Sequence, residues 1–117
     1  MLLNLSNHPS STWSAAQLQA ATAQYGTVQD LPFPNIPPDA TADEVRRLAE
    51  QYEAEVRRVD PAAVHLMGEM TFTFALVKRL QAIGIPCIAS TTERIAEERE
   101  GQKIVTFRFV QFRNYVY

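Results

Sequence analysis

The stretch PAAVHLMGEMTFTFALVKRLQAIG, residues 61–84, decides the fold of this 117-residue chain. Its first part, residues 63–67, is an apolar run of strand length that ends at Gly68. Its second part, residues 70–83, is apolar almost all round and stops at Gly84, a common helix terminator. The stretch therefore predicts a buried strand that passes directly into a helix, the repeating unit of α/β domains.

The sequence before this stretch repeats the same unit. Two capping patterns, a Ser or Thr followed three residues later by Gln or Glu, predict a helix at residues 15–25 and another from Thr41 to Val59. Four prolines within residues 32–38 exclude a helix or a central strand and predict a stiff loop. Short apolar runs predict further strands at residues 1–5, 28–31 and 85–89.

The end of the chain has a different pattern. Residues 104–112, rich in Val, Phe and Thr, follow a Glu-Gly pair at 100–101 and predict a β-hairpin, with a short helix at 94–100 as the alternative. The apolar alternation changes phase near Phe109, which predicts a β-bulge.

Together these elements predict one α/β domain over residues 1–117, with a doubly wound, mostly parallel sheet and a C-terminal antiparallel hairpin. In such sheets ligands bind beyond the carboxyl ends of the strands. The residues that follow the strands are therefore the first candidates for a functional site.

Composition narrows the possible partners. Eleven Lys and Arg against thirteen Asp and Glu give a net charge of −2, which argues against duplex DNA or an anionic membrane surface as a partner. The single cysteine, Cys87, excludes an internal disulfide, and the sequence shows no signal peptide or long apolar run. We expect a cytoplasmic protein.

Charge is unevenly distributed along the chain. Residues 1–29 contain no Asp, Glu, Lys or Arg but many Ser, Thr and Asn, whereas residues 43–60 hold six acidic and four basic side chains. The uncharged segment fits a buried strand that leads into a neutral polar pocket. The alternative is chance composition together with an ordinary helix cap.

Three segments are predicted to reach the carboxyl edge of the sheet, and they carry mostly hydroxyl and amide groups. The amides that open the helix after Gly68 suit a phosphate, although Glu69 or Thr71 can instead cap that helix. No Walker or dinucleotide-binding motif is present. The candidate ligand-binding residues are Ser6, Asn7 and Ser11, then Gly68, Glu69, Met70 and Thr73, then Ser90, Thr91 and Thr92.

Three residues are candidates for a catalytic role. His8 can act as a base or acid, or close a turn before a proline. Arg94 can clamp a phosphate, or pair with a neighbouring glutamate. Thr71 offers a hydroxyl, and His65 lies inside a predicted strand and is interpreted as a core residue. No metal-ligand spacing and no GxSxG motif occurs, so we expect neither a metal nor a cofactor.

The helix at residues 70–83 has more than one apolar face. In a chain of this size a second copy of the protein is the expected cover for the second face, which predicts a homodimer.

Four strings in order, LNLSNH at 3–8, GEMTF at 68–72, STTER at 90–94 and FVQFRNY at 109–115, resemble small CRISPR-associated proteins related to CARF (CRISPR-associated Rossmann fold) domains. The resemblance covers nearly the whole chain, and some of these proteins are ring nucleases. It implies a Rossmann-like three-layer domain that binds cyclic oligoadenylate, most often cyclic tetra-adenylate, at a homodimer interface. It also implies cleavage without metal to linear products that end in a 2′,3′-cyclic phosphate.

Two other functions fit the same sequence. A non-catalytic module could sense or sequester the nucleotide in the same pocket. An adaptor could dock its apolar third helix on another protein and bind no nucleotide.

Overall fold

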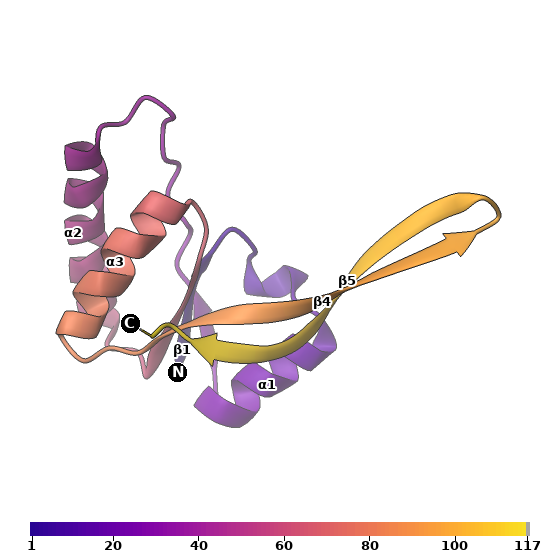
Figure 1. The fold of residues 1–117 in the computed structure, drawn as a ribbon. Helices are drawn as coiled ribbons and strands as arrows, with labels where there is room; N and C mark the ends of the chain where they lie inside the picture. Colours follow the sequence, from indigo (N-terminus) through magenta and orange to yellow (C-terminus); the bar gives the residue numbers. More distant parts are fainter. Residues whose placement is uncertain (117) are drawn as a thin grey trace.

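The computed structural model describes residues 1–116 as a five-stranded sheet with helices on both faces (Figure 1). Residue 117, the end of the predicted domain, lies outside the described residues. The strand order is β2-β1-β3-β4-β5, in which β5 alone runs antiparallel to its neighbour. The elements are β1 (Leu2–Ser6), a 3-10 turn (Ser10–Thr12), α1 (Ala15–Tyr25), β2 (Val28–Asp30), α2 (Ala42–Val59), β3 (Ala63–Met67), α3 (Met70–Ala82), β4 (Cys87–Arg99) and β5 (Gln102–Asn114).

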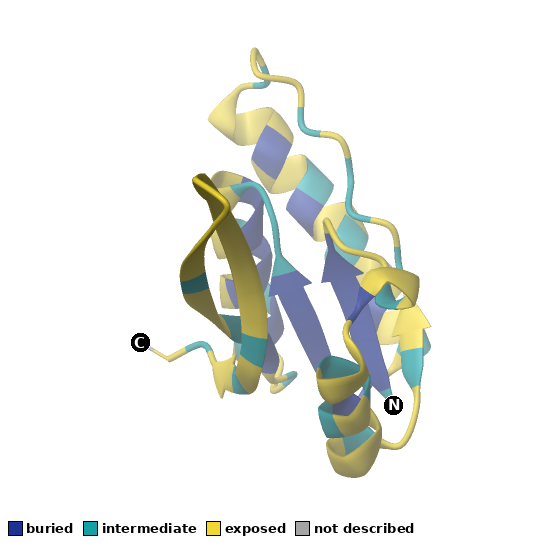
Figure 2. Cartoon of the chain, turned by 90° about the vertical axis from the view of Figure 1, so that its right-hand side faces the viewer, coloured by how far each residue is buried: buried dark blue, intermediate teal, exposed yellow. Residues whose placement is uncertain are grey.

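These bounds confirm the predicted α/β class, the mostly parallel sheet and the C-terminal hairpin. Strands β1 and β3 are the most buried part of the sheet (Figure 2). They pair in parallel register along their full length. Because β2 lies on one side of β1 and β3 on the other, the direction of winding changes between β1 and β3, where α/β sheets bind ligands.

Each face of the sheet has its own hydrophobic core. Helices α2 and α3 cover one face, where Phe72 packs among buried leucines and valines. Helix α1 and Trp13 cover the other face, with Leu2, Ala63 and Ile88 beneath them. The loop before α2 also closes on the first core, because Phe33 and Phe72 meet edge to face with ring centroids 5.3 Å apart.

The hairpin is longer than the sequence predicted. Residues 90–94 were expected as a loop, but they lie inside the thirteen-residue strand β4, because the antiparallel ladder with β5 continues far beyond the sheet. A two-residue turn closes the hairpin with positive φ angles at Glu100 (53°) and Gly101 (80°), which is the twist that a tight hairpin favours. The alternative helix at 94–100 is wrong, and the ladder shifts register opposite Val110, where a bulge was predicted.

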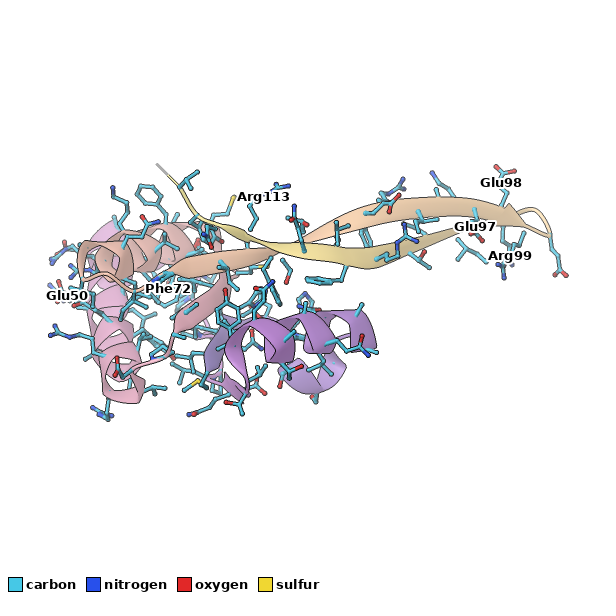
Figure 3. All side chains as sticks on the ribbon, turned by 90° about the horizontal axis from the view of Figure 1, so that it is seen from below. Glu50, Phe72, Glu97, Glu98, Arg99 and Arg113 are labelled. Atoms are coloured by element: carbon cyan, nitrogen blue, oxygen red, sulfur yellow. The ribbon has the colours of Figure 1, made fainter. Side chains whose placement is uncertain are left out.

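The outer half of the hairpin projects away from both cores. Figure 3 shows Glu97, Glu98 and Arg99 near its end, far from the helices. Its side chains are mostly exposed, including Phe107 at 68%. We call residues 92–109 the arm.

Among residues 1–116, no helix has both the length and the hydropathy needed to cross a bilayer.

Candidate functional site

Asn4 is the centre of a buried hydrogen-bond network between strands. Its side chain is 2% exposed on β1. Its Nδ2 group donates to the His8 carbonyl at 2.9 Å and to Asp30 Oδ1 at 2.9 Å. Its Oδ1 atom accepts from Ser6 Oγ at 2.8 Å and lies 2.9 Å from His65 Nδ1. Since both partners of Nδ2 can only accept, the orientation of the amide is determined by its neighbours.

This orientation sets the tautomer of His65. Nδ1 faces an acceptor, so it carries the proton. Burial, together with a smaller effect of the nearby His8, lowers the pKa of His65 to about 4, so the ring is neutral at pH 7. Its Nε2 is therefore an acceptor, and the Ser90 hydroxyl donates to it at 2.7 Å. Gln17 Nε2 in turn donates to Ser90 Oγ at 2.9 Å. We call Asn4, His65 and Ser90 the strand network.

Asp30 anchors the other end of the network. Its carboxylate accepts from the Asn4 amide, from the Ser10 backbone N–H at 3.1 Å and from the Ser10 hydroxyl at 2.8 Å. Partial burial raises the pKa of Asp30, but these hydrogen bonds outweigh it and hold the pKa below its usual value. The carboxylate thus ties the loop after β1 to β2.

His65 and Ser90 of the strand network form one wall of a cavity of about 390 Å³ at the carboxyl edge of the sheet, a size within the range of small-molecule sites. Trp13 forms another wall: its indole N–H donates to the His8 carbonyl at 3.0 Å, and its ring lies 5.0 Å from that of His65. We call this the α1-side cavity. Its lining is His8, Thr12, Trp13, Gln17, His65, Met67, Ser90, Thr92 and Phe107.

Two of the three predicted catalytic residues, His8 and Arg94, lie at or beside this cavity. His8 lines it, and its imidazole makes no hydrogen bond within residues 1–116. Arg94 follows Thr92 by two positions on β4, so it shares the face that carries Ser90 and Thr92. Its guanidinium has no ion pair in the described part of the chain, whereas Arg108 on the opposite face pairs with Glu93.

At the predicted phosphate site after Gly68, the side chain of Glu69 already occupies the backbone N–H groups that a phosphate would need. The Glu69 carboxylate accepts from the backbone N–H groups of Thr71 and Phe72 and from the Thr71 hydroxyl. These hydrogen bonds, led by the Thr71 hydroxyl, lower the pKa of Glu69. The geometry therefore matches the alternative that sequence left open, in which Glu69 caps α3.

Gly68 is required for packing. A Cβ atom at this position would lie 2.2 Å from the Phe33 ring, so the close approach is to a side chain of the protein. Gly68, Met70 and Thr73 line a second cavity of about 390 Å³, which we call the α3-side cavity. Thr73 is 7% exposed there, and its hydroxyl has no hydrogen-bond partner among residues 1–116. Met67 lines both cavities.

The remaining predicted ligand-binding residues are divided. Ser6 donates to Asn4 in the strand network. The backbone N–H of Asn7 donates to the Met67 carbonyl at 3.3 Å. Ser11 is exposed in the 3-10 turn. Thr91 donates to the Gln111 carbonyl at 3.2 Å and does not line the α1-side cavity. The three predicted segments do converge at Met67, because the Ser90 N–H also contacts its sulfur at 3.2 Å.

Sequence reasoning did not select Asn4, Trp13, Gln17 or Phe107 as site residues. It assigned His65 to the core, and the buried ring with both nitrogens hydrogen-bonded confirms that interpretation. One signal could have found the pair at the centre. Asn4 and His65 are polar residues in the middle of two apolar runs that were both predicted as buried parallel strands. A buried amide and a buried imidazole each need a partner, and adjacent strands can supply it.

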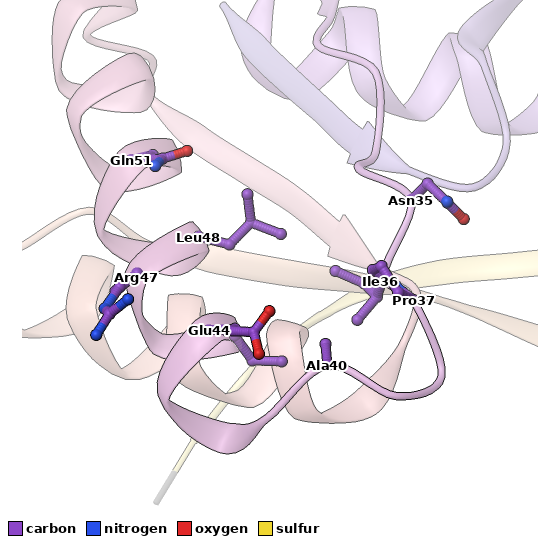
Figure 4. A pocket seen from close by; sticks show the side chains of 9 residues that line it. Asn35, Ile36, Pro37, Ala40, Glu44, Arg47, Leu48 and Gln51 are labelled. Carbon is purple, nitrogen blue, oxygen red and sulfur yellow. The ribbon is translucent and has the colours of Figure 1, made fainter.

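A further cavity, of about 310 Å³, lies between the proline-rich loop and α2 (Figure 4). Its two charged side chains are already engaged: Glu44 completes the capping box with Thr41, and Arg47 pairs with Asp43 at 3.5 Å. Neither charged group is therefore left unpaired for a ligand. Within residues 1–116, no group of three or more His, Cys, Asp or Glu side chains is arranged to hold a metal ion.

The profile of the uncharacterized protein MJ1673 family matches residues 1–113. The chain belongs to the uncharacterized protein MJ1673 family. The matched range contains every residue of the strand network and the whole arm, so the family profile covers the α1-side cavity completely. No curated protein and no solved structure matches the chain.

Proposed function

We propose that the protein is a cytoplasmic, homodimeric ring nuclease that binds cyclic oligoadenylate, with cyclic tetra-adenylate as the preferred ring. The reaction needs no metal and no cofactor, and it switches off type III CRISPR signalling. In this proposal the domain is a Rossmann-like, three-layer relative of CARF domains. The strand order and the helices on both faces support that assignment.

The α1-side cavity is the observation that carries the proposal. It gathers side chains from the loop after β1 and from strands β3 and β4 with two aromatic rings, Trp13 and Phe107. Nucleotide bases stack on such rings, and neutral polar groups read their edges. Arg94 lies beside the cavity and has no ion pair among residues 1–116. A small cyclic nucleotide suits this neutral, aromatic cup better than a duplex does.

The proposed reaction uses a nucleophile from the substrate. The ribose 2′-oxygen attacks the adjacent phosphorus, the bond from phosphorus to the 5′-oxygen breaks, and a 2′,3′-cyclic phosphate remains. His8 takes the proton of the 2′-hydroxyl, a solvent water protonates the leaving 5′-oxygen, and His8 then gives its proton back to solvent. Arg94 stabilises the charge on the phosphoryl oxygens. Thr71 has no part in this step, because its hydroxyl is bound by Glu69.

The homodimer in this proposal rests on exposed apolar residues of α3. Met70 is 83% exposed and Phe74 is 69% exposed, and both line the α3-side cavity. A two-fold arrangement through α3 would give the dimer two α1-side cavities. Sedimentation of the purified protein is expected to give twice the monomer mass.

The decisive experiment incubates the protein with cyclic tetra-adenylate in EDTA and separates the products by chromatography. We expect linear products with a 2′,3′-cyclic phosphate. His8→Ala is expected to slow single-turnover cleavage by about 10² to 10⁴, and Arg94→Ala by about 10². Arg99→Ala, at the end of the arm, is the matched control and should leave the rate unchanged. Intact rings of every size would overturn the enzyme assignment.

A binding module without catalysis is the second candidate. Both nitrogens of His65 are engaged in the strand network, so proton transfer depends on His8 alone. Calorimetry that shows binding, together with chromatography that shows no product, would favour sensing or sequestration.

A further inference from the structure

The Ser90 hydroxyl has one hydrogen and two lone pairs, and the surrounding residues determine how each is used. The hydrogen is directed by His65, whose Nε2 lies 2.7 Å from Ser90 Oγ. This direction follows from a series of hydrogen bonds, each with a fixed donor and acceptor, that begins at a carboxylate. Asp30 can only accept, so Asn4 donates to it with Nδ2 and presents Oδ1 to His65.

His65 transmits that polarity across the sheet. Its Nδ1 must donate to Asn4 Oδ1, and its ring is 2% exposed with no carboxylate as a hydrogen-bond partner. Burial keeps it neutral, since its pKa is lowered to about 4. A neutral ring with a proton on Nδ1 has a lone pair on Nε2. The hydrogen of Ser90 is thereby committed to His65.

One of the two lone pairs of Ser90 is also committed, because Gln17 Nε2 donates to Oγ at 2.9 Å. A single lone pair remains, on a hydroxyl that lines the α1-side cavity. From this arrangement we infer that Ser90 is a specificity-determining residue that accepts a hydrogen bond from an N–H or O–H group of the ligand and rejects an oxygen that can only accept. His65 is the positioning residue that enforces this role.

The inference deepens the proposed function and rests on it for the identity of the ligand. On an adenylate ring, two groups can donate to Ser90: the 6-amino group of adenine and the 2′-hydroxyl of ribose. Phosphate oxygens cannot donate a hydrogen bond to Ser90, so in this proposal the phosphates lie beside Arg94. The polarity of Ser90 itself depends only on contacts within the protein.

The first test needs no ligand. In the His8→Gln variant His65 is the only imidazole, and its ¹⁵N chemical shifts at pH 7 report which nitrogen carries the proton. We expect a protonated Nδ1 and an unprotonated Nε2. A protonated Nε2 would overturn the inference, because Ser90 would then be free to donate.

The second test measures recognition. Quenching of Trp13, the only tryptophan, reports binding in a His8→Ala background, in which cleavage is slow enough for binding to be measured first. Three rings are compared: cyclic tetra-adenylate, its 6-oxo (inosine) analogue and its 2′-deoxy analogue. We expect one analogue to bind about tenfold more weakly, the loss of one hydrogen bond with a partner left unpaired. The analogue that weakens binding identifies the donor.

Ser90→Ala should abolish that difference between rings, and Thr91→Ala, which removes a hydroxyl outside the cavity, should preserve it. A difference that persists in Ser90→Ala would overturn the inference while leaving the proposed function intact. Failure of the parent ring to bind at all would overturn the proposed function, and the tautomer of His65 would still decide the polarity of Ser90.

Discussion

The strand network and the junction between β3 and α3, residues 68–73, lie at the same edge of the sheet on either side of Met67, and they use polar side chains in opposite ways. In the junction, Glu69 and Thr71 are satisfied by each other and by the first turn of α3. In the strand network, Asn4, His65 and Ser90 come from three strands, and they leave one lone pair on a hydroxyl that lines a cavity.

The difference shows that the distance between two polar residues along the sequence affects whether they stabilise local structure or form a binding surface. Polar groups two or three residues apart can reach one another locally, and they cap a helix. Polar groups that are 25 and 61 residues apart meet only after the sheet has formed. Groups of the second kind are held rigidly, and rigid groups can recognise a ligand.

The largest expected effect is the loss of the amide at the centre of the strand network. Asn4→Ala leaves the Nδ1–H of His65 without its acceptor and removes the ties to Asp30 and to the loop at His8. We expect the free energy of unfolding to fall by about 3 kcal/mol, measured by urea denaturation. Asn7→Ala, whose side chain is exposed, is the control and should change it by less than about 0.5 kcal/mol. A similar small change for Asn4→Ala would contradict the central role of this amide.

The second prediction concerns pH. The pKa of His65 is about 4 in the folded protein, against 6.5 for the unperturbed group. As the pH falls below 6.5 the unfolded chain binds a proton that the folded protein does not, so stability decreases. Between pH 6.5 and pH 5 this linkage amounts to about 2 kcal/mol. Urea titrations of His65→Gln should lack this slope, and those of His8→Gln should keep it. A flat profile for the unaltered protein would show that His65 is not held neutral.

The third prediction tests the packing in the junction. Gly68→Ala places a methyl group against the Phe33 ring and should lower the free energy of unfolding by about 1.5 kcal/mol. Since Phe33 is the obstacle, the same substitution in a Phe33→Leu background should cost less. An equal cost in both backgrounds would assign the effect to the backbone instead.

The smallest effect is expected at the helix cap. Glu69→Ala removes the acceptor for the first amides of α3 and should lower the free energy of unfolding by about 1 kcal/mol in thermal or urea denaturation. It should leave the tautomer of His65 unchanged, since the junction and the strand network share no hydrogen bond among residues 1–116. Glu98→Ala on the arm is the matched removal of an exposed carboxylate and should have almost no effect. A shift in the His65 resonances of Glu69→Ala would show that the two regions are coupled.

Much of the fold was predictable because its causes are local. The capping patterns at Ser14 and Thr41 predicted where α1 and α2 begin, and both caps form. The length of β4 was not predictable, because residues 90–99 become a strand only through pairing with β5. Of the candidate site residues, His8, Ser90 and Thr92 line the α1-side cavity, and Glu69 caps its helix instead.

The sequence by itself determined the succession of strands and helices along the chain. It also determined the uncharged first segment and the apolar runs that become β1 and β3. Each of these features depends on neighbouring residues. Only the tertiary structure decided that Asn4 lies opposite His65 in parallel register and that His65 reaches Ser90. The physical reason is that side-chain hydrogen bonds between strands join residues far apart in the chain. Their separation in the sequence does not indicate that they will meet. The polarity of the cavity wall is therefore a property of the assembled sheet.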